Sequence, residues 1–392
     1  MKRRLLVLTP RFPYPAIGGD RIRILHICRA LSVPFELTLL SLCESREELS
    51  LQPDDGLFSR IVRIHLPRWR SYLNTALAIP GSRPLQLAYY ESAEFRKALK
   101  RLGPQHDLVL AHLIRTGHYI EYLPGIRIIE MTDAISMNYQ HIREIRGKFS
   151  LKKLVYSVEQ SRLKRYEQQT VRNFDRTWLT SQADRDFLDP SHESPIEVIP
   201  NGTGIESLPF HPPALDAKVI VFIGNMVSLQ NQDACHHFIQ TILPKVQQRA
   251  NVVFRIVGNA PESVKRQFRH YTGIEMTGRI NRIEEGVKDA FCGVCPIRAG
   301  AGIQNKVLEY LAMGLPCVTS SLGLGGIKAR PGVELLEYHD PDEAAYQILM
   351  LLSDPELREK IALEGRDLVS RKYDWKNIEQ EFTESCLSLS QD

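Results

Sequence analysis

The chain of 392 residues is too long for a single ordinary hydrophobic core, so we expect two domains. Hydrophobic residues make up 43% and charged residues 24% of the chain, which is typical of a globular protein. No apolar run approaches the length of a membrane span, and the apolar stretch 5–8 is too short for a signal peptide. Seven cysteines follow no disulfide framework, which indicates reduced thiols and predicts a cytoplasmic protein.

Positive charge is concentrated in the first half of the chain. Residues 1–200 hold 30 Lys and Arg against 22 Asp and Glu, whereas residues 201–392 hold 20 against 24. The excess gathers in 143–176, and a basic surface of this kind attracts nucleic acid or an anionic membrane. No nucleic-acid-binding motif supports the first partner, so we predict no nucleic acid. A membrane contact and a simple solvated helix face remain as alternatives.

The first half alternates apolar runs with helical patterns, which predicts a parallel sheet covered on both faces. Helical periodicity marks 20–32, 92–102 and 150–173. The expected strands are 4–9, 36–42, 61–66, 107–112, 126–131 and 176–181.

A segment rich in proline and glycine, 196–213, interrupts this rhythm and is typical of an interdomain linker. We therefore expect an N-terminal domain 1–200, a second domain 201–370, and a C-terminal helix within 371–392 that crosses back to the first domain. The second alternation has expected strands at 218–225, 252–258, 274–278, 292–297, 316–320 and 333–338. Ligands of open α/β sheets bind at the carboxyl ends of the strands, so a cleft between the domains is the expected active site.

The most informative stretch is 298–318, which reads RAGAGIQNKVLEYLAMGLPCV. A glycine-rich loop leads into a short helix that we expect Asn305 to cap, because its side chain can accept a backbone N–H. Exposed amides at a helix start favour an anion, and Lys306 adds a positive charge there. Glu309 lies about one turn further on and suits the hydroxyls of a ribose. These residues together predict a nucleotide-sugar pocket, with an ordinary loop–helix–strand connection as the alternative.

Other polar residues follow predicted strands. Gly18 and Gly19 precede the first helix, where backbone can approach an anion. Gly224 ends the first strand of the second half and suits a phosphate. His112 and Asp133 follow two strands of the first half and are candidates for the active site. A structural role for His112 and a helix cap at Asp133 are the alternatives.

The stretch 298–318 also resembles the donor-site signature of glycosyltransferase family 4, and the nearest similarity is to bacterial sugar transferases of exopolysaccharide and PEP-CTERM loci. The resemblance implies an α/β fold of the GT-B type, with two Rossmann-like domains facing a central cleft. It further implies transfer with retention at the anomeric carbon, without a metal and without another cofactor. The implied catalytic residues are His112, Asp133, Arg298 and Lys306. The implied donor-binding residues are Gly18, Gly19, Gly224, Asn225, Arg279, Gly302, Ile303, Gln304, Asn305, Lys306 and Glu309.

Two positions depart from the family pattern. Asn225 stands where the family commonly has an arginine, so Lys306 and Arg298 are the candidates for neutralising a diphosphate. Ala301 stands where many members carry a second glutamate, which leaves the donor sugar open and motivates a non-catalytic scaffold as an alternative. A nucleotide-sugar epimerase of the same fold is the other alternative.

The function we expect is transfer of a sugar from a nucleotide diphosphate sugar to a glycan or polyisoprenoid-linked acceptor in polysaccharide biosynthesis. The basic segment 143–176 would hold the protein against the inner face of the cytoplasmic membrane.

Overall fold

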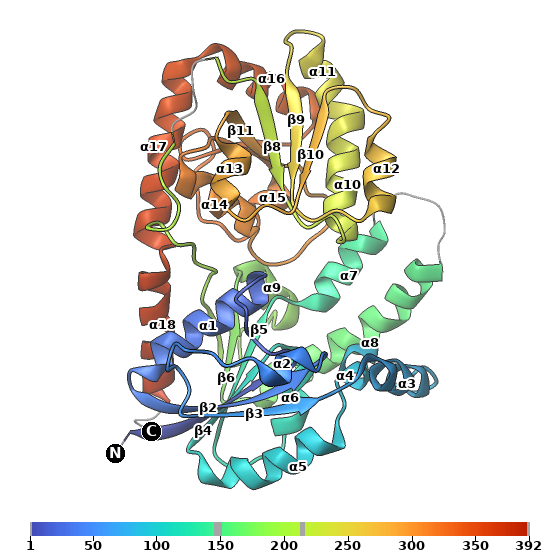
Figure 1. Cartoon of the computed structure of the whole chain (residues 1–392), viewed down its shortest axis with the longest axis vertical. Coiled ribbons are helices and arrows are strands. Elements are labelled where there is room, and N and C mark those ends of the chain that lie inside the picture. The colour runs from blue at the N-terminus through green and yellow to red at the C-terminus, as the bar shows by residue number, and fades with distance from the viewer. Residues whose placement is uncertain (1, 145–150, 212–215, 390–392) are drawn as a thin grey trace. The chain divides into compact units, whose positions relative to one another are not determined.

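The computed structural model describes residues 2–144, 151–211 and 216–389 (Figure 1). The chain divides into two compact units, which we call unit 1 (Met1–Pro200 with Ile378–Asp392) and unit 2 (Asn201–Asn377). Each unit contains one parallel sheet with helices between its strands, so the predicted α/β class with two Rossmann-like units is confirmed.

The sheet of unit 1 has seven strands in the order β3-β2-β1-β4-β5-β6-β7, and every neighbouring pair is parallel. β4 is buried throughout and β1 is buried from its third residue on, as expected for a sheet covered on both faces. The strands are β1 (Arg3–Thr9), β2 (Phe35–Cys43), β3 (Arg60–His65), β4 (Leu108–His112), β5 (Ile126–Thr132), β6 (Arg176–Leu179) and β7 (Ile196–Val198). β7 lies inside the segment that we expected to be a linker, so that expectation is wrong for its first residues.

The helices of unit 1 connect these strands. They are α1 (Gly19–Ser32), α2 (Glu47–Ser50), α3 (Arg68–Ala78), α4 (Leu85–Tyr89), α5 (Ala93–Leu102), α6 (Ile114–Ile120), α7 (Ile135–Glu144), α8 (Leu151–Asn173) and α9 (Gln182–Leu188). The last helix of the chain, α18 (Trp375–Ser388), begins in unit 2 and continues in unit 1. In unit 1, its Ser385 Oγ accepts a hydrogen bond from the Trp178 indole at 2.9 Å, and its Phe382 ring packs edge-on against Trp178.

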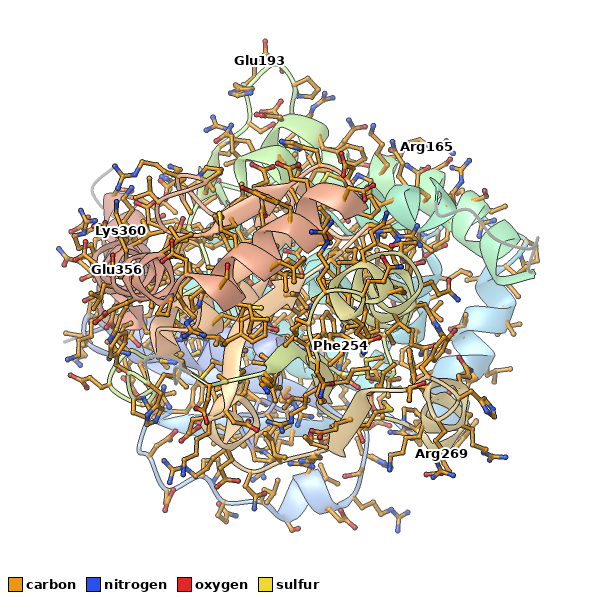
Figure 2. All side chains as sticks on the ribbon, turned by 90° about the horizontal axis from the view of Figure 1, so that it is seen from above. Arg165, Glu193, Phe254, Arg269, Glu356 and Lys360 are labelled. Carbon is orange, nitrogen blue, oxygen red and sulfur yellow. The ribbon has the colours of Figure 1, made fainter. Side chains whose placement is uncertain are left out.

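The sheet of unit 2 has six strands in the order β10-β9-β8-β11-β12-β13. The strands are β8 (Val219–Ile223), β9 (Val253–Val257), β10 (Ile274–Gly278), β11 (Ala290–Cys295), β12 (Cys317–Ser320) and β13 (Leu336–Tyr338). The helices are α10 (Leu229–His237), α11 (Leu243–Gln247), α12 (Glu262–Phe268), α13 (Ile283–Val287), α14 (Asn305–Met313), α15 (Ser321–Leu324), α16 (Pro341–Ser353) and α17 (Pro355–Lys372). Phe254 of β9 is fully buried, whereas Arg269, Glu356 and Lys360 are exposed side chains at the margin of the view in Figure 2.

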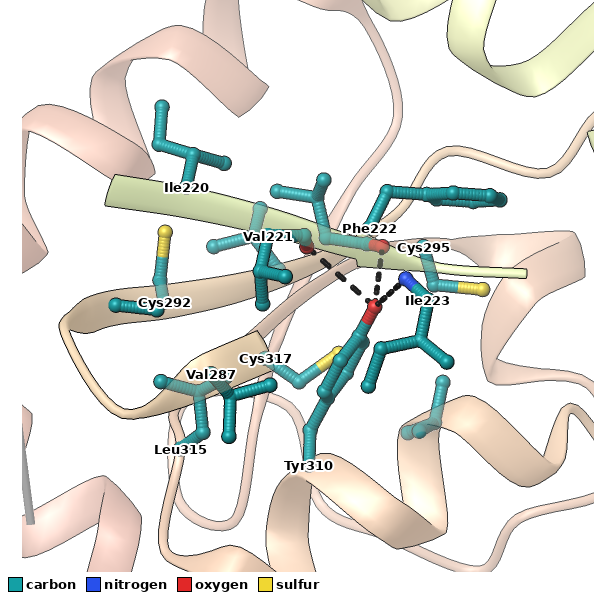
Figure 3. Packing of buried hydrophobic residues seen from close by; sticks show 14 of the residues in the cluster. Ile220, Val221, Phe222, Ile223, Val287, Cys292, Cys295, Tyr310, Leu315 and Cys317 are labelled. Carbon is teal, nitrogen blue, oxygen red and sulfur yellow. Dashed lines mark hydrogen bonds between the residues drawn. The ribbon is translucent and has the colours of Figure 1, made fainter. Parts of the chain in front are cut away.

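Tyr310 anchors helix α14 to the centre of the unit 2 sheet (Figure 3). Its hydroxyl accepts a hydrogen bond from the Ile223 N–H at 2.7 Å and lies 3.4 Å from the carbonyl oxygens of Val221 and Val294. The ring packs on Gly293, where an added Cβ would lie 2.7 Å from it. Because these contacts fix α14 against β8 and β11, they also fix the residues at its start.

Candidate functional site

The strand order reverses once in each sheet, and most of the candidate residues follow the strands at these two reversals. In unit 2, β8 lies beside β11, while the chain runs outward through β9 and β10 on one side and through β12 and β13 on the other. The loops that follow β8 and β11 therefore leave the sheet next to each other, which is where open α/β sheets bind ligands. In unit 1, β1 lies beside β4 in the same way.

Lys306 joins the two loops of the unit 2 reversal. Its Nζ donates a hydrogen bond to Asn231 Oδ1 at 3.1 Å and lies 4.7 Å from the centre of the Phe222 ring. The Asn231 amide in turn donates to the carbonyl oxygen of Asn225 at 2.9 Å. Within 2–144, 151–211 and 216–389, no carboxylate forms an ion pair with Lys306, so its charge is available to an anion.

Glu309 lies one turn further along α14 and is half-buried. Its carboxylate makes no hydrogen bond or ion pair with the part of the chain that the structure describes. Burial raises the pKa of the Glu309 carboxyl, and the nearby Lys306 ammonium opposes that rise. A half-buried carboxylate without a protein partner keeps its acceptor capacity for water or a ligand, so Glu309 remains a candidate ligand-binding group.

The start of α14 differs in one respect from the sequence prediction. Gln304 is the N-cap, and no side chain caps the helix, so the prediction that Asn305 is the cap is wrong. Asn305 is the first helical residue, and its Oδ1 accepts a hydrogen bond from Asn201 at 2.9 Å. Gly302, with φ 66°, and the buried Ile303 complete the loop before it. The helix therefore begins with amides that no side chain covers, next to Lys306.

Arg298, a candidate cation, is already paired. Its Nη2 lies 2.6 Å from Asp233 Oδ1 and its Nε 3.1 Å from Asp233 Oδ2, so the pair is bidentate. Asp233 comes from α10, the helix that follows the β8 loop. An anion at Arg298 would have to compete with this carboxylate, so Lys306 is the stronger candidate of the two.

Gly258 allows two loops of unit 2 to approach closely. A Cβ at this position would lie 2.2 Å from the carbonyl oxygen of Gly224, and Gly258 has φ 140°, which other residues rarely adopt. The loop after β9 therefore presses against the candidate Gly224–Asn225 backbone. Arg279 follows β10, two strands away from β8, and its side chain is exposed.

In unit 1, His112 is one end of a chain of buried polar groups that its sequence position did not predict. Its Nδ1 lies 2.6 Å from Glu130 Oε2, and Glu130 Oε1 accepts a hydrogen bond from Arg23 Nε at 2.7 Å. Burial alone would raise the pKa of the Glu130 carboxyl, but Arg23 and His112 lower it to about 2. A carboxylate on Nδ1 orients the imidazole, so Nε2 is the ring nitrogen that remains for a further hydrogen bond.

Arg23 extends this chain of polar groups to residues 199 and 200, where the first segment of unit 1 ends. It is 1% exposed, and its guanidinium donates hydrogen bonds to the carbonyl oxygens of Ile199 at 3.0 Å and Pro200 at 2.9 Å. Sequence analysis missed both Arg23 and Glu130. The available signal was Glu130 near the end of the strand IRIIEM, where it follows two isoleucines that are buried in the sheet.

Gly18 and Gly19 lie where they were expected. Gly18, with φ 102°, is the N-cap of α1 and Gly19 is its first residue, and no side chain caps this helix start. Strand β1, which precedes them, pairs with β4, which ends at His112. The Gly18-Gly19 pair therefore lies at the strand reversal of unit 1.

Asp133 does not cap the helix that follows it. Its Oδ1 accepts a hydrogen bond from Thr180 at 3.0 Å, while Asp184 accepts the Ala134 N–H and Glu167 accepts the Ile135 N–H. The alternative that Asp133 is a helix cap is therefore wrong. Burial and the neighbouring Asp184 carboxylate raise the pKa of Asp133 to about 7.

In the described ranges, no three His, Cys, Asp or Glu side chains lie together as metal ligands would. None of the helices described combines the length and apolarity needed to cross a bilayer. Arg146 and Lys148 of the predicted basic segment lie outside the described residues.

The two parallel sheets with their strand reversals define a fold of the GT-B class. Residues 217–354 of unit 2, which contain the loops after β8 and β11, match the family described as glycosyl transferases group 1. None of the curated protein sequences matches the chain.

Solved structures of the same fold cover almost the whole chain. Sucrose-phosphate synthase from Thermosynechococcus elongatus is 16% identical, with a TM-score of 0.76 over 99% of this chain and 100% of its own. HepE from Anabaena, in complex with UDP and glucose, is 15% identical, with a TM-score of 0.68 over 98% of this chain and 100% of its own. A glycosyltransferase from Rickettsia africae is 11% identical, with a TM-score of 0.67 and full coverage of both chains. At these identities the likeness establishes the fold.

Proposed function

We propose that the protein is a glycosyltransferase that moves a sugar from a nucleoside diphosphate sugar to an acceptor. The observation that carries this proposal is the start of α14, where an unpaired ammonium and an unpartnered carboxylate lie one turn apart at the strand reversal of unit 2. The same segment matches the group 1 glycosyl transferases, and the similar Anabaena HepE has been solved with UDP-glucose.

In this proposal the diphosphate binds at the start of α14 and at the loop after β8. Lys306 and the uncapped amides of the helix stabilise the negative charge that develops as the bond between the sugar and the diphosphate breaks. This positive potential is the reason to propose a reaction that needs no metal. Glu309 accepts hydrogen bonds from the ribose hydroxyls, since it has no partner of its own in the described residues.

We further propose that residues of unit 1 contact the acceptor. With Nδ1 of His112 donating to Glu130, its Nε2 can accept a hydrogen bond from a sugar hydroxyl. Burial and the neighbouring Asp184 raise the pKa of the Asp133 carboxyl, which makes Asp133 a candidate proton donor or acceptor. Gly18 and Gly19 offer backbone amides at the start of α1 to an anion.

The finer features of the activity follow from the family resemblance and belong to the same proposal. They are hexosyl transfer, retention at the anomeric carbon, and a polyisoprenoid-linked or glycan acceptor in polysaccharide biosynthesis. Sugar transfer to a lipid-linked acceptor requires the protein to attach reversibly to the cytoplasmic membrane. The cationic side chains of α8 can bind anionic lipid headgroups.

Isothermal titration calorimetry of the whole chain with UDP, GDP and ADP tests the donor site, and release of nucleoside diphosphate from the matching sugar tests turnover. We expect one nucleotide to bind clearly more tightly than the others, and release that depends on an added acceptor. Binding without release under any acceptor would favour the non-catalytic scaffold, which Ala301 motivates. Conversion of the donor to an isomer without an acceptor would favour the epimerase. Failure to bind any of the three nucleotides would contradict the proposal.

A further inference from the structure

Helix α3 presents large apolar side chains and two arginines to solvent, while small polar side chains face the protein. Five of the large apolar side chains that are exposed in the described residues lie between 69 and 79. On the inner side, Ser71 is 2% exposed, and the Asn74 amide donates to the carbonyl oxygen of Glu91 at 2.9 Å. The exposed set is Trp69 at 63%, Tyr72 at 64%, Leu73 at 50%, Leu77 at 73% and Ile79 at 58%. This sidedness is the reverse of that of an ordinary surface helix, and a concentrated apolar patch of this kind marks an interaction surface.

A groove with a cationic rim adjoins this helix. It has a volume of about 770 Å³ and lies between α3 and α5. Trp69 and Leu73 contribute apolar walls, and Lys97 and Lys100 of α5 line it with positive charge. Such a groove matches a ligand that is apolar in one part and anionic in another.

A second cavity of about 450 Å³ is lined by arginines. Arg83 and Arg96 share the carboxylate of Glu91, whereas Arg162 and Arg165 of α8 make no ion pair with the residues that the structure describes. Arg162 donates a hydrogen bond to the carbonyl oxygen of Ile79, just past the end of α3, at 2.8 Å. Arg165 projects from α8 at the margin of the view in Figure 2.

The two cavities and α3 form one amphipathic surface of unit 1, which we call the α3 surface. Figure 1 shows α3 at the margin of unit 1 beside α4. The residues lining the two cavities include seven arginines and lysines against three glutamates. Positive charge therefore surrounds the exposed apolar face of α3.

We propose that the α3 surface binds an anionic phospholipid bilayer, with the apolar face of α3 in the interfacial region and the surrounding cations against the headgroups. The chemistry is that of amphipathic helices that lie in membrane interfaces, where an apolar face with aromatic residues is flanked by Lys and Arg. A protein partner would need carboxylates and an apolar groove placed to match this surface. An anionic bilayer offers negative headgroups and an apolar interior everywhere on its surface, so it needs no such match. This inference deepens the proposed function, on which it rests for the lipid-linked acceptor, and it adds an apolar contact to the cationic one.

Co-sedimentation of the full chain with vesicles tests the inference. The vesicles are phosphatidylcholine alone or phosphatidylcholine mixed with phosphatidylglycerol, at low and at high salt. We expect at least about tenfold stronger binding to the anionic vesicles at low salt, falling as salt screens the charges. Equal binding to both vesicles, or no binding to either, would overturn the proposal.

Two variants separate the apolar and the charged contributions. Trp69→Ser with Leu77→Ser should lower the bound fraction by about fivefold or more at both salt concentrations, because burial of apolar area is lost. Lys97→Gln with Lys100→Gln and Arg165→Gln should lower it about tenfold at low salt and hardly at all at high salt. Wild-type binding in both variants would overturn the proposal.

Matched controls change equally exposed residues of unit 2 and should bind like the wild type. They are Tyr346→Ser with Leu363→Ser, and Arg266→Gln with Lys288→Gln and Lys360→Gln.

Sedimentation velocity tests whether a second copy covers the surface instead. A concentration-dependent dimer that the Trp69→Ser and Leu77→Ser exchange abolishes would assign the surface to self-association and overturn the membrane proposal. Calorimetry with the nucleotide keeps the two proposals apart, because the surface variants should keep the wild-type affinity for it. Vesicle binding without nucleotide binding would sink the proposed function and leave the α3 surface standing.

Discussion

Replacement of Arg23 by methionine tests the buried chain that orients His112. Methionine keeps most of the length of the side chain but removes the charge and every donor. The exchange leaves the Glu130 carboxylate buried with His112 as its remaining partner, and it removes the hydrogen bonds to the carbonyl oxygens of Ile199 and Pro200. Breaking a buried ion pair from one side typically costs about 3–5 kcal/mol.

The lowered pKa of Glu130 gives a second way to judge how much free energy this ion pair contributes to stability. The pKa falls from the ordinary value of 4.5 to about 2 in the folded protein. At about 1.4 kcal/mol per pH unit, this shift corresponds to a contribution of roughly 3 kcal/mol, which agrees with the lower end of the range above. Because the folded pKa is depressed, this stabilisation is complete above about pH 4.5 and is lost as the pH falls toward 2.

In the Arg23→Met variant, the contribution of Glu130 to the free energy of unfolding should depend on pH in the opposite direction. Without Arg23, burial raises the pKa of the Glu130 carboxyl, so protonation relieves the buried charge as the pH falls. We therefore expect a stability deficit of about 3–5 kcal/mol at pH 7 that narrows toward pH 4.

The assay is urea unfolding of unit 1, followed by the fluorescence of Trp178 after the other two tryptophans have been replaced by phenylalanine. Arg68→Met is the matched control, since Arg68 pairs with Glu44 at 3.3 Å with a side chain that is 69% exposed. A surface pair of this kind contributes less than about 1 kcal/mol. A deficit for Arg23→Met that is no larger than that of the control, or that stays constant between pH 7 and pH 4, would refute the reasoning.

Three further predictions concern the proposed site. Lys306→Gln should lower kcat by about tenfold or more with a smaller change in donor affinity, because the charge of Lys306 matters most as the diphosphate departs. An equal loss in kcat and in donor affinity would contradict this role, since it would mean that Lys306 stabilises the bound donor as much as the transition state. His112→Gln should lower kcat/KM for the acceptor while leaving nucleotide affinity in calorimetry unchanged. A loss of nucleotide affinity would contradict the proposed role of His112 in acceptor binding. Gly258→Ala should weaken nucleotide binding, because its Cβ would lie 2.2 Å from the Gly224 carbonyl oxygen. Gly332→Ala, at φ 81° with no atom within 4 Å of the added Cβ, should lower the thermal midpoint through backbone strain and spare nucleotide binding.

The sequence predicted most of the parallel strands because buried strands are nearly continuous apolar runs, which a single sequence displays directly. It missed β7 because only three residues, Ile196–Val198, form that edge strand, and prolines surround them. It also predicted the start of α14 to within one residue, although Gln304 rather than Asn305 is the cap.

The features that the sequence did not predict depend on contacts between residues far apart in the chain. The Glu167 carboxylate that binds the first amides of α7 lies 32 residues from Ile135, so a local cap at Asp133 was the natural but wrong alternative. Arg23 and Glu130 are separated by 107 positions and leave no local spacing pattern. The place of Lys306 and Glu309 in the first turns of α14 was predictable because both lie close to the same glycine-rich loop, and their role in donor binding stays a prediction.

The central claim is that Glu309 holds the ribose of a nucleoside diphosphate, and calorimetry with UDP and 2′-deoxy-UDP tests it most directly. Wild type should bind the deoxynucleotide more weakly, and Glu309→Ala should bind UDP about ten- to a hundredfold more weakly than wild type does, since a hydrogen bond to a charged group is worth about 1.5–3 kcal/mol. The variant should then no longer distinguish the two nucleotides, whereas the exposed control Glu359→Ala should behave like wild type. If Glu309→Ala binds UDP with wild-type affinity, or still discriminates between the two nucleotides as wild type does, the donor-site assignment is contradicted.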